Sequence, residues 1–319
     1  MSAGTALRLG TRASALALAQ SGHVAEALST RSGREVTLVH ISTAGDRDQT
    51  TRVAQFGSTG VFVSALRDAL LTGEIDFAVH SYKDLPTAPA EGLVIAAVPP
   101  RADPRDALIA RDGLTLEKLP AGARVGTGAV RRIAQLLAVR PDLVYVPIRG
   151  NVDTRLGKVA SGELDAVVLA VAGLARLGRG AEITEAIDPD VVLPSPAQGA
   201  LAVECRADDL GLVELLAGLD SPGARAEVAA ERALLAALEA GCSAPVAAHA
   251  VAVLGPEAAE FTLRARVAAL DGSAVRTDAR SITVSHPYDS LQTDAEAVGR
   301  QLAADLLANG ADTLMGRTA

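Results

Sequence analysis

Aromatic residues are scarce in this chain: among 319 residues there are three Tyr, four Phe and no Trp. Because proteins that bind single-stranded nucleic acid often stack bases on aromatic rings, this scarcity argues against nucleic-acid binding. The formal net charge of -8 likewise disfavours general binding to polyanions. Hydrophobic residues nevertheless make up 49% of the sequence, so the cores must be built mainly from Ala, Val and Leu.

Cysteine is rare as well: the chain has only Cys205 and Cys242, and neither belongs to a Cys-x-x-Cys motif. No apolar run reaches the length of about 18 residues that spans a membrane, and Met1 to Gly10 has no basic-then-apolar leader. We therefore expect a soluble protein without membrane contact in a reducing compartment, by default the cytoplasm. The five histidines show no metal-ligand spacing, so no metal is expected.

The length of the chain predicts two or three domains, and the order of its segments indicates where they lie. Strand-like and helix-like segments alternate up to His80 and again from Pro104 to Ala170, as in parallel α/β sheets. The apolar run from Ala200 to Cys205 could return the chain to the first lobe. Beyond Asp220, three strand-like runs are grouped between two helices, which is typical of an α+β domain. The predicted domains are residues 1–102 with 199–219, residues 103–198 and residues 220–319.

Hydrophobic periodicity and capping residues predict the individual elements. Ser14, for example, stands where an N-cap would precede a helix after a short strand. The expected helices cover residues 15–29, 61–71, 130–139, 152–160, 224–238 and 293–308. The expected strands cover residues 6–10, 35–42, 75–80, 124–126, 143–147, 166–170, 200–205, 246–254, 261–270 and 280–285.

Basic residues gather in one segment of this acidic protein. Between Arg124 and Lys158, seven Arg and Lys residues stand against two Asp residues, which gives seven minus two, or +5. Several of these arginines follow strands or open helices, and both helix N-termini and arginine forks favour anions. The segment therefore predicts a small polyanionic ligand, with solvated helix charges as the alternative. The ligand hypothesis suits Arg131, Arg132, Arg149 and Arg155, whereas solvated charges suit Arg140 and Lys158.

Cys242 lies in the loop from Leu238 to Pro245, at the end of an expected helix. Gly241 can adopt the left-handed conformation that commonly ends a helix, and Pro245 prevents a restart nearby. Cys205, by contrast, lies inside an apolar strand, where a thiol fills the core. On position alone, an inert loop cysteine remains the simpler interpretation of Cys242.

Six stretches of the sequence, in this order, resemble the porphobilinogen deaminase family, also called hydroxymethylbilane synthases, over essentially the whole chain. They are Arg8–Ser14 with Gln20, Ala78–Pro86, Gly126–Arg132, Arg149–Leu156, Pro196–Gly199 and Glu231–Pro245. The resemblance implies two α/β domains of the periplasmic-binding-protein type, followed by an α+β domain that carries the cysteine. It also implies a monomeric transferase of tetrapyrrole and heme biosynthesis.

In this family, a dipyrromethane cofactor is held by a thioether to the loop cysteine, here Cys242. Four porphobilinogen molecules are added to it with loss of ammonia, and hydrolysis releases hydroxymethylbilane. The resemblance implies Asp84 as the catalytic residue, on the first domain. The implied cofactor-binding residues, besides Cys242, are Ser81, Lys83, Asp84, Thr127, Arg131, Arg132 and Arg155. The implied substrate-binding residues are Arg12, Ser14, Gln20, Arg149, Arg176 and Gln198.

The sequence departs from the family pattern in two places. Gln55 and Thr59 stand where many members carry lysines, and Ala129 stands where many have serine. The contribution of the loop before Gly60 to substrate binding is therefore open. Without the family resemblance, the sequence also fits two other functions. One is a two-lobed solute-binding protein, and the other is an anion-binding regulatory domain in which Cys242 would be incidental.

Overall fold

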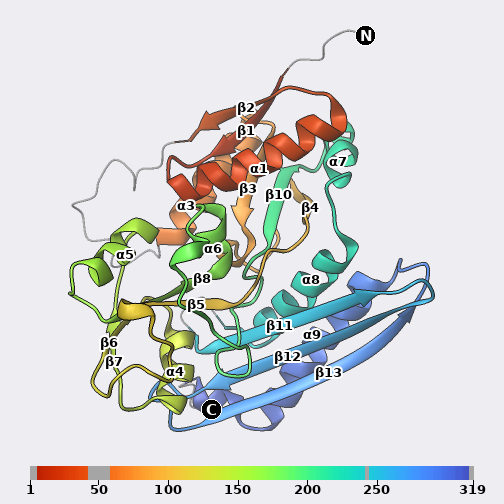
Figure 1. Cartoon of the computed structure of the whole chain (residues 1–319). Helices are drawn as coiled ribbons and strands as arrows, with labels where there is room; N and C mark the ends of the chain where they lie inside the picture. The colour runs from red at the N-terminus through yellow and green to blue at the C-terminus, as the bar shows by residue number, and fades with distance from the viewer. Residues whose placement is uncertain (1–5, 42–57, 241–243, 316–319) are drawn as a thin grey trace. The chain divides into compact units, whose positions relative to one another are not determined.

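The structure, a computed structural model, describes residues 6–41, 58–240 and 244–315 (Figure 1). The chain forms two compact units. The first consists of Met1–Arg101 and Ala200–Ser221, and the second consists of Ala102–Gly199 and Pro222–Ala319. Cys242 and Gln55, on which expectations were placed, lie outside the described residues.

The first unit is built on a five-stranded sheet of order β2-β1-β3-β10-β4. Its strands are β1 (Leu7–Thr11), β2 (Val36–His40), β3 (Phe77–Ser81), β4 (Leu93–Ala97) and β10 (Leu201–Arg206). Its helices are α1 (Ala15–Ser32), α3 (Ser58–Leu71) and α7 (Leu210–Ala217), with a 3-10 turn, η1, at Tyr82–Asp84. Two clusters of buried side chains, one containing Leu28 and Phe77 and the other Leu70 and Ile75, form its main cores.

The segment expected to return the chain to the first lobe does so as β10. The expected parallel arrangement holds for β1, β2 and β3, but β10 runs antiparallel to both β3 and β4. Leu201 pairs with Ser81 at the end of β3, and Val203 pairs with Ala97 at the end of β4. The chain leaves the unit after β4 and re-enters beside these strand ends, so β10 has to run in the opposite direction.

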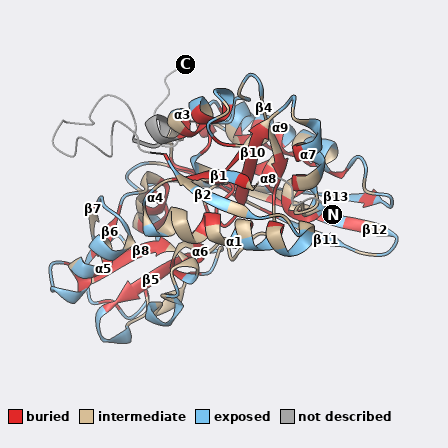
Figure 2. Ribbon diagram, turned by 90° about the horizontal axis from the view of Figure 1, so that it is seen from above, coloured by how far each residue is buried: buried red, intermediate tan, exposed pale blue. Residues whose placement is uncertain are grey.

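The second unit contains a similar five-stranded sheet, of order β7-β6-β8-β5-β9. Its strands are β5 (Asp106–Ala110), β6 (Arg124–Thr127), β7 (Val144–Pro147), β8 (Ala166–Ala170) and β9 (Glu185–Ala186). Its helices are α4 (Val130–Val139), α5 (Val152–Ala160) and α6 (Val171–Arg176), with 3-10 turns η2 (Arg111–Gly113) and η3 (Gly180–Glu182). This sheet is also mixed, because β5 runs antiparallel to β8 and β9. Figure 2 shows β5 and β8 as buried strands.

The second unit also contains a separate three-stranded antiparallel sheet of order β11-β12-β13. Its strands are β11 (Val246–Leu254), β12 (Ala258–Ala268) and β13 (Val275–Ser285), and its helices are α8 (Pro222–Ala237), α9 (Leu291–Ala308) and α10 (Ala311–Leu314). Alternate residues of β12, such as Phe261 and Leu263, are fully buried in the core shared with α8 and α9. Gly299 allows the two helices to approach closely, since a Cβ there would lie 2.2 Å from the Ala230 carbonyl oxygen.

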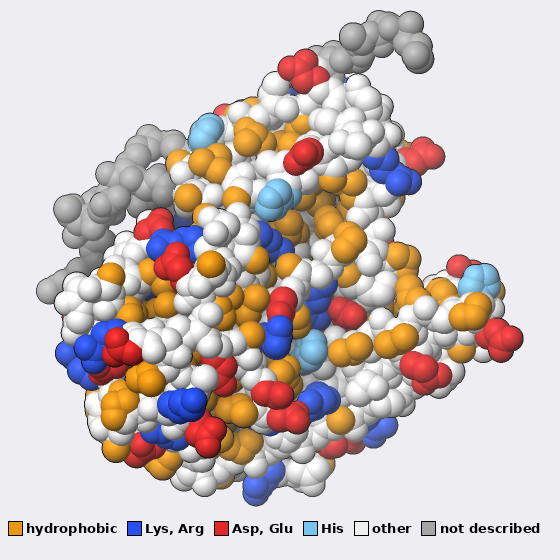
Figure 3. Space-filling model, viewed as in Figure 1, with side chains coloured by type: hydrophobic (Ala, Val, Ile, Leu, Met, Phe, Trp, Pro, Cys, Tyr) orange, Lys and Arg blue, Asp and Glu red, His pale blue; other side chains and the backbone are white. Residues whose placement is uncertain are grey.

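The expected fold class, α/β sheets followed by a C-terminal α+β sheet, is confirmed. The division of the second unit between residues 103–198 and 220–319 stays a prediction. Among the helices in the described ranges, none is long and apolar enough to cross a membrane. On the face seen in Figure 3, acidic and basic side chains are mixed.

Candidate active site

Two of the expected site residues, Lys83 and Asp84, directly follow the buried strand β3. The chain leaves Ser81 as the 3-10 turn η1, which is closed by a hydrogen bond of 3.2 Å from the Leu85 amide to the Tyr82 carbonyl. Lys83 is half-buried and Asp84 is exposed, whereas Leu85 is buried and anchors the turn. The turn therefore presents a carboxylate to solvent from a fixed strand end.

Three more expected residues lie where β1 leads into α1. Ser14 is the N-cap of α1, and its Oγ accepts a 3.3 Å hydrogen bond from the Ala17 amide. Gln20 is buried, and its Nε2 donates to Ser81 Oγ over 2.8 Å. Arg12 is half-buried just before the helix. Ser14 thus caps a helix and Gln20 braces the end of β3, while the contact of all three with substrate stays a prediction.

In the second unit, Asp106 gathers a buried group of polar side chains around it. Its carboxylate has no exposed surface and accepts hydrogen bonds from Arg131 at 2.7 and 3.1 Å and from Arg132 at 2.6 and 3.0 Å. Gln198 donates to the same carboxylate over 2.8 Å and accepts from Arg131 over 3.2 Å. The arginines also bind the carbonyl oxygens of Leu193 and Val168. We call Asp106, Arg131, Arg132 and Gln198 the Asp106 cluster.

The Asp106 cluster carries more positive than negative charge. Burial alone would raise the pKa of Asp106, but the charges and hydrogen bonds of the two arginines outweigh it and hold that pKa well below its usual range. Burial lowers the pKa of Arg131, although Asp106 opposes this shift. With both guanidinium groups protonated, two positive charges face one negative charge, which leaves an excess of +1 in a buried place.

Two further arginines of this unit, Arg155 and Arg176, are half-buried. Burial and the charge of Arg132 lower the pKa of Arg155, and burial lowers the pKa of Arg176 to about 10, so both stay charged at neutral pH. Each donates to a backbone carbonyl, Arg155 to Gly150 over 2.9 Å and Arg176 to Gly199 over 2.7 Å. Within the parts of the chain that the structure describes, neither forms an ion pair with an acidic residue. Both are therefore able to neutralise an anion.

Thr127 ends β6 and Arg149 follows β7, and these two strands are parallel neighbours. Thr127 is fully buried, and its Oγ1 accepts from the Ala129 amide over 3.4 Å. Arg149 is exposed and lines a pocket of about 490 Å³ together with Gly128. Any side chain at position 128 would put its Cβ 2.7 Å from the Ile148 carbonyl oxygen, so glycine is needed to keep this strand end open. The pocket leaves Arg149 accessible to an anionic ligand.

Cys242, which lies outside the described residues, comes between α8 and β11 in the chain. Helix α8 ends at Ala237, and Glu239 already has a positive φ of 47°. The Ala268 amide then binds the Pro245 carbonyl over 3.2 Å, where the sheet begins. The other cysteine, Cys205, is fully buried in β10.

The family comparisons bear on the whole chain. A family model described as porphobilinogen deaminase, dipyromethane cofactor binding domain, matches residues 7–214, and another, described as porphobilinogen deaminase, C-terminal domain, matches residues 225–308. The chain belongs to the porphobilinogen deaminase family. It is therefore an enzyme of the transferase class, and its cofactor is the dipyromethane of that family.

Curated relatives agree with this family. A porphobilinogen deaminase from Thermobifida fusca is 58% identical over 99% of this chain and 97% of its own length. Porphobilinogen deaminase 1 from Streptomyces coelicolor is 57% identical over 98% of both chains. Among solved structures, the periplasmic VFT2 domain of Bordetella pertussis BvgS is 16% identical, with a TM-score of 0.37, and the match covers 66% of this chain and 85% of that one.

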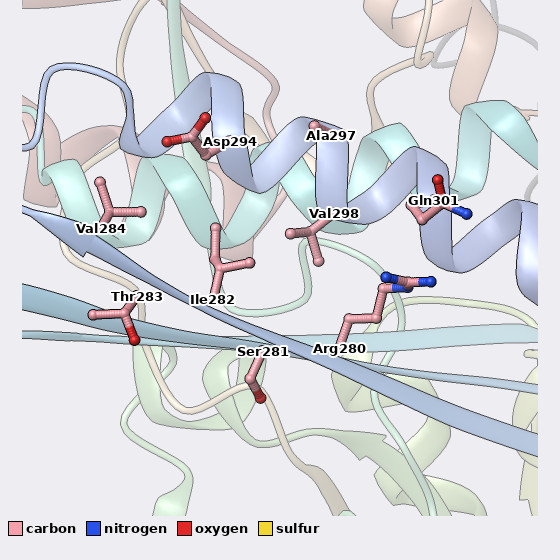
Figure 4. Close-up of a pocket in the computed structure, with 9 residues that line it drawn as sticks. All are labelled: Arg280, Ser281, Ile282, Thr283, Val284, Asp294, Ala297, Val298 and Gln301. Atoms are coloured by element: carbon pink, nitrogen blue, oxygen red, sulfur yellow. The ribbon is translucent and has the colours of Figure 1, made fainter.

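The residues present fit the dipyrromethane cofactor, whose pyrrole rings carry acetate and propionate groups. The excess charge of the Asp106 cluster and the half-buried cations Arg155 and Arg176 would each be offset by a carboxylate. In contrast, a second pocket, of about 430 Å³ between β13 and α9, has an arginine that is already neutralised (Figure 4). There, Arg280 pairs with Asp305 at 2.6 Å. The arginines on α4, α5 and α6 therefore fit an anionic cofactor better than the pocket at Arg280 does.

Sequence reasoning missed Asp106 and misread Arg140. The available signal for Asp106 was a lone charge opening the otherwise apolar run Asp106–Ala110. Arg140 was expected to be a solvated helix charge, but it binds the carbonyl groups of Leu116, Glu117 and Leu119 and pairs with Asp142. Replacing Arg140 would therefore disturb the structure, so this residue is unsuitable as a control variant for the arginines that are expected to bind ligand. Arg124, an exposed residue at the start of β6, is better suited.

The first prediction concerns stability. Asp106→Asn should lower the free energy of unfolding by about 3–5 kcal/mol, because two buried guanidinium groups would lose their counter-charge. A urea titration at pH 7 measures this change. Asp142→Asn is the control, since Asp142 also pairs with an arginine but is exposed, and it should lower the free energy of unfolding far less than Asp106→Asn does.

The effect of Asp106 should also depend on pH in one direction. Its folded pKa lies below its unfolded pKa, so its stabilisation is fully present above the unfolded value, about 3.9, and is lost as pH falls toward the folded value. The difference between wild type and Asp106→Asn should accordingly be constant from pH 5 to 8 and shrink only in stronger acid. Equal urea midpoints for the two proteins at pH 7 would contradict this role.

Proposed function

We propose that this protein joins four porphobilinogen molecules head to tail on a dipyrromethane held by Cys242, releases ammonia at each addition and frees hydroxymethylbilane by hydrolysis. When bound, the cofactor supplies the pyrrole carbon at which the first substrate is joined. The observation that carries the proposal is the positive charge that the protein leaves unneutralised in the Asp106 cluster and on Arg155 and Arg176. This charge suits a ligand with many carboxylates. Family membership supplies the chemistry of that ligand.

Asp84 is the proposed catalytic residue. Loss of ammonia from porphobilinogen leaves a positive charge that is shared with the pyrrole nitrogen, and a carboxylate near that N-H stabilises the developing cation. The same group can take a proton from the ring carbon that is attacked, as the carboxylate, and pass a proton to the departing amine, as the carboxylic acid. The exposure of Asp84 on a turn anchored by Leu85 supports this function. Ser81 and Lys83, beside it, are proposed to bind the cofactor.

The arginines are proposed to neutralise acetate and propionate groups. Arg131, Arg132, Arg155 and Thr127 would hold the cofactor, and Arg149, Arg176 and Gln198 would hold substrate. Arg12, Ser14 and Gln20 would bind substrate from the first unit. The bonds of Gln198 to Asp106 and Arg131 give it a second task, which is to orient the cluster.

Each domain would then contribute one part of the machinery. The first (residues 1–102 with 199–219) carries Asp84, the second (residues 103–198) carries the arginines, and the third (residues 220–319) carries Cys242. We also propose that the protein acts as a cytoplasmic monomer. The two cysteines, one of them fully buried, suit a reducing compartment.

The intact mass of the purified protein tests the function. An excess that matches a bound dipyrromethane is expected, together with release of hydroxymethylbilane when porphobilinogen is supplied. An unmodified chain that binds anionic ligands without turnover would contradict the proposal and favour an anion-binding domain or a solute-binding protein.

The second prediction concerns the excess charge. Arg132→Gln leaves Asp106 paired one-to-one with Arg131, so the cluster should fold but lose its surplus positive charge. A carboxylate of the cofactor would then be underpaired, which should weaken its binding by roughly 2–5 kcal/mol if the site is dry. The measurement is the fraction of holoprotein, by intact mass, after incubating apoprotein with graded amounts of porphobilinogen.

Arg124→Gln is the matched control for Arg132→Gln. Arg124 belongs to the same unit, at the start of β6, but is exposed, so its loss should leave holoprotein formation unchanged. Equal losses in the two variants would indicate that the arginines act only through the overall charge of the protein.

A further inference from the structure

A second buried ionic group, in the first unit, has no part in the function proposed so far. Glu204 on β10 is only 2% exposed. Its carboxylate accepts hydrogen bonds from Arg67 Nε at 3.1 and 3.2 Å and from Arg67 Nη2 at 2.9 Å, and its Oε2 lies 3.1 Å from His80 Nε2. Glu204, Arg67 and His80 thus join β10, α3 and β3.

The stability of the unit does not explain this group. Burial by itself raises the pKa of Glu204, but the contacts with His80 and Arg67 outweigh it, so the pKa is lowered and the carboxylate stays ionised. An apolar side chain of similar volume would fill the same place without desolvating a charge, and such replacements are often neutral or stabilising. What the ionic group provides in addition is direction, because a bidentate arginine fixes the carboxylate.

The group acts on the strand end that leads to Asp84. His80 immediately precedes Ser81, and successive side chains of a strand point to opposite faces of its sheet. The Nε2 of His80 lies 3.1 Å from the Glu204 carboxylate on one face, and Ser81 accepts a hydrogen bond from Gln20 of α1 on the other. The Tyr82 amide also binds the Ala200 carbonyl over 3.1 Å at the start of β10. The last two residues of β3 and the first of η1 are therefore each tied to a different part of the unit.

Helix α3 is the third element that is fixed in this way. It packs on β3 and β10, with Leu66 and Leu70 buried in the same cluster as Ala78, two residues before His80 (Figure 1). Arg67 extends from this helix to Glu204. A single carboxylate thus contacts side chains of both α3 and β3 just before the turn that presents Asp84.

We propose that Glu204 is a positioning residue for turnover, which holds His80 and Arg67 so that η1 presents the Asp84 carboxylate in its working orientation. The proposal rests on the proposed catalytic function of Asp84. Misplacing a catalytic group by about 1 Å can cost on the order of a hundredfold in rate, so even a small shift of this turn should be measurable.

The test begins with Glu204→Gln, which keeps the shape of the side chain and removes its charge. The variant should keep its covalent cofactor by intact mass, and its kcat should fall by about ten- to a hundredfold, whereas KM for porphobilinogen stays within about twofold. Arg67→Gln, which leaves Glu204 and His80 in place, should lower kcat in the same direction by a smaller factor. It keeps the test valid if Glu204→Gln folds poorly.

Asp76→Asn is the matched control. Asp76 directly precedes β3 at its other end and pairs with Arg8 at 2.7 Å, so it is also a carboxylate held by an arginine in the same sheet. Its loss should leave kcat unchanged within about twofold, because the far end of the strand carries no catalytic turn. A loss of kcat in Asp76→Asn as large as that in Glu204→Gln would overturn the proposal, since it would indicate general loosening of the sheet.

A double-mutant comparison separates positioning from loss of stability. In Asp84→Glu, the carboxylate is already displaced, so adding Glu204→Gln should lower kcat by less than about threefold, far less than in the wild-type background. The same factor in both backgrounds would overturn the proposal. Wild-type kcat in Glu204→Gln, together with an inactive Asp84→Asn, would also overturn the proposal. That result would leave the proposed function of Asp84 intact. Wild-type turnover in Asp84→Asn would instead refute the function of Asp84 and the positioning role with it.

Discussion

Replacing Cys242 by Ser should yield folded protein that carries no covalent cofactor and has no turnover. A thioether requires sulfur, and a serine hydroxyl is a far poorer nucleophile than a thiol at neutral pH. The loop between α8 and β11 begins after the buried residue Leu238, so a change of one atom in a loop side chain should not disturb the helix or the sheet. Intact mass measures the result, since the wild-type protein should carry the added mass and the variant should not.

Cys205→Ser is the control for this experiment. Cys205 is fully buried in β10, and burial raises its pKa to about 11, so it is not a thiolate at neutral pH. Its replacement should lower stability, because a hydroxyl would be buried in an apolar core, and should leave cofactor attachment intact. Acid-stable pyrrole on Cys242→Ser, or its absence from folded Cys205→Ser, would show that the attachment site is assigned to the wrong cysteine.

Much of the fold could be predicted because its signals are local. Helix α5 has the predicted ends, and the predicted N-cap of α1 is confirmed, since Ser14 Oγ accepts from the Ala17 amide over 3.3 Å. Strand β12 has a clear alternation of buried and less buried residues, which indicates a sheet with one covered face. These segments carry their structural information within about ten residues.

Other elements could not be predicted from local patterns. Strands β4 and β5 and helix α7 were all missed. Strand β5 is buried at every residue, so it shows no alternation, and such a short apolar run cannot be assigned by periodicity. The antiparallel direction of β10 depends on where the chain re-enters the sheet, which is a long-range property.

The candidate site was predictable in composition but not in pairing. The sequence displayed the surplus of arginines between Arg124 and Lys158, because charges can be counted. It did not reveal that Asp106 neutralises one of the two guanidinium groups at Arg131 and Arg132, because that carboxylate lies 25 residues before Arg131, on strand β5. For the same reason, Arg140 seemed solvated, although three carbonyl groups of a preceding loop bind it. Pairings between distant residues become visible only when the sheet is formed.

The buried ionic groups of the two units suggest a shared principle. Asp106 orients arginines that would hold carboxylates, and Glu204 orients the strand end before Asp84. In both groups, a buried carboxylate fixes arginine side chains that come from other elements. The groups that would contact ligand are therefore supported by neighbours whose own positions are set by charge, and variants of the two kinds should be distinguishable. Loss of Arg132 should affect cofactor loading, whereas loss of Glu204 should affect kcat.

Asp84→Asn should retain the fold and the bound cofactor while turnover falls by at least about a hundredfold. Asparagine preserves the size and hydrogen-bonding capacity of the side chain, but it has neither the negative charge that stabilises a developing cation nor the capacity to carry a proton. Asp84 is exposed, so its replacement removes no buried contact and should leave the urea midpoint unchanged. Steady-state kinetics on protein whose cofactor content has been verified by mass give the measurement.

Two comparisons make the result for Asp84 specific. Asp84→Glu should keep residual activity, because the carboxylate survives in a displaced position on the same turn. Asp112→Asn is a suitable control, since Asp112 is also an exposed acidic residue in a 3-10 turn after a buried strand, but it lies in the second unit, in η2. It should have wild-type kcat, because no catalytic step is proposed there. Near wild-type turnover in Asp84→Asn would remove Asp84 from the mechanism, since the charge and the proton-carrying group would both be absent while the reaction proceeded.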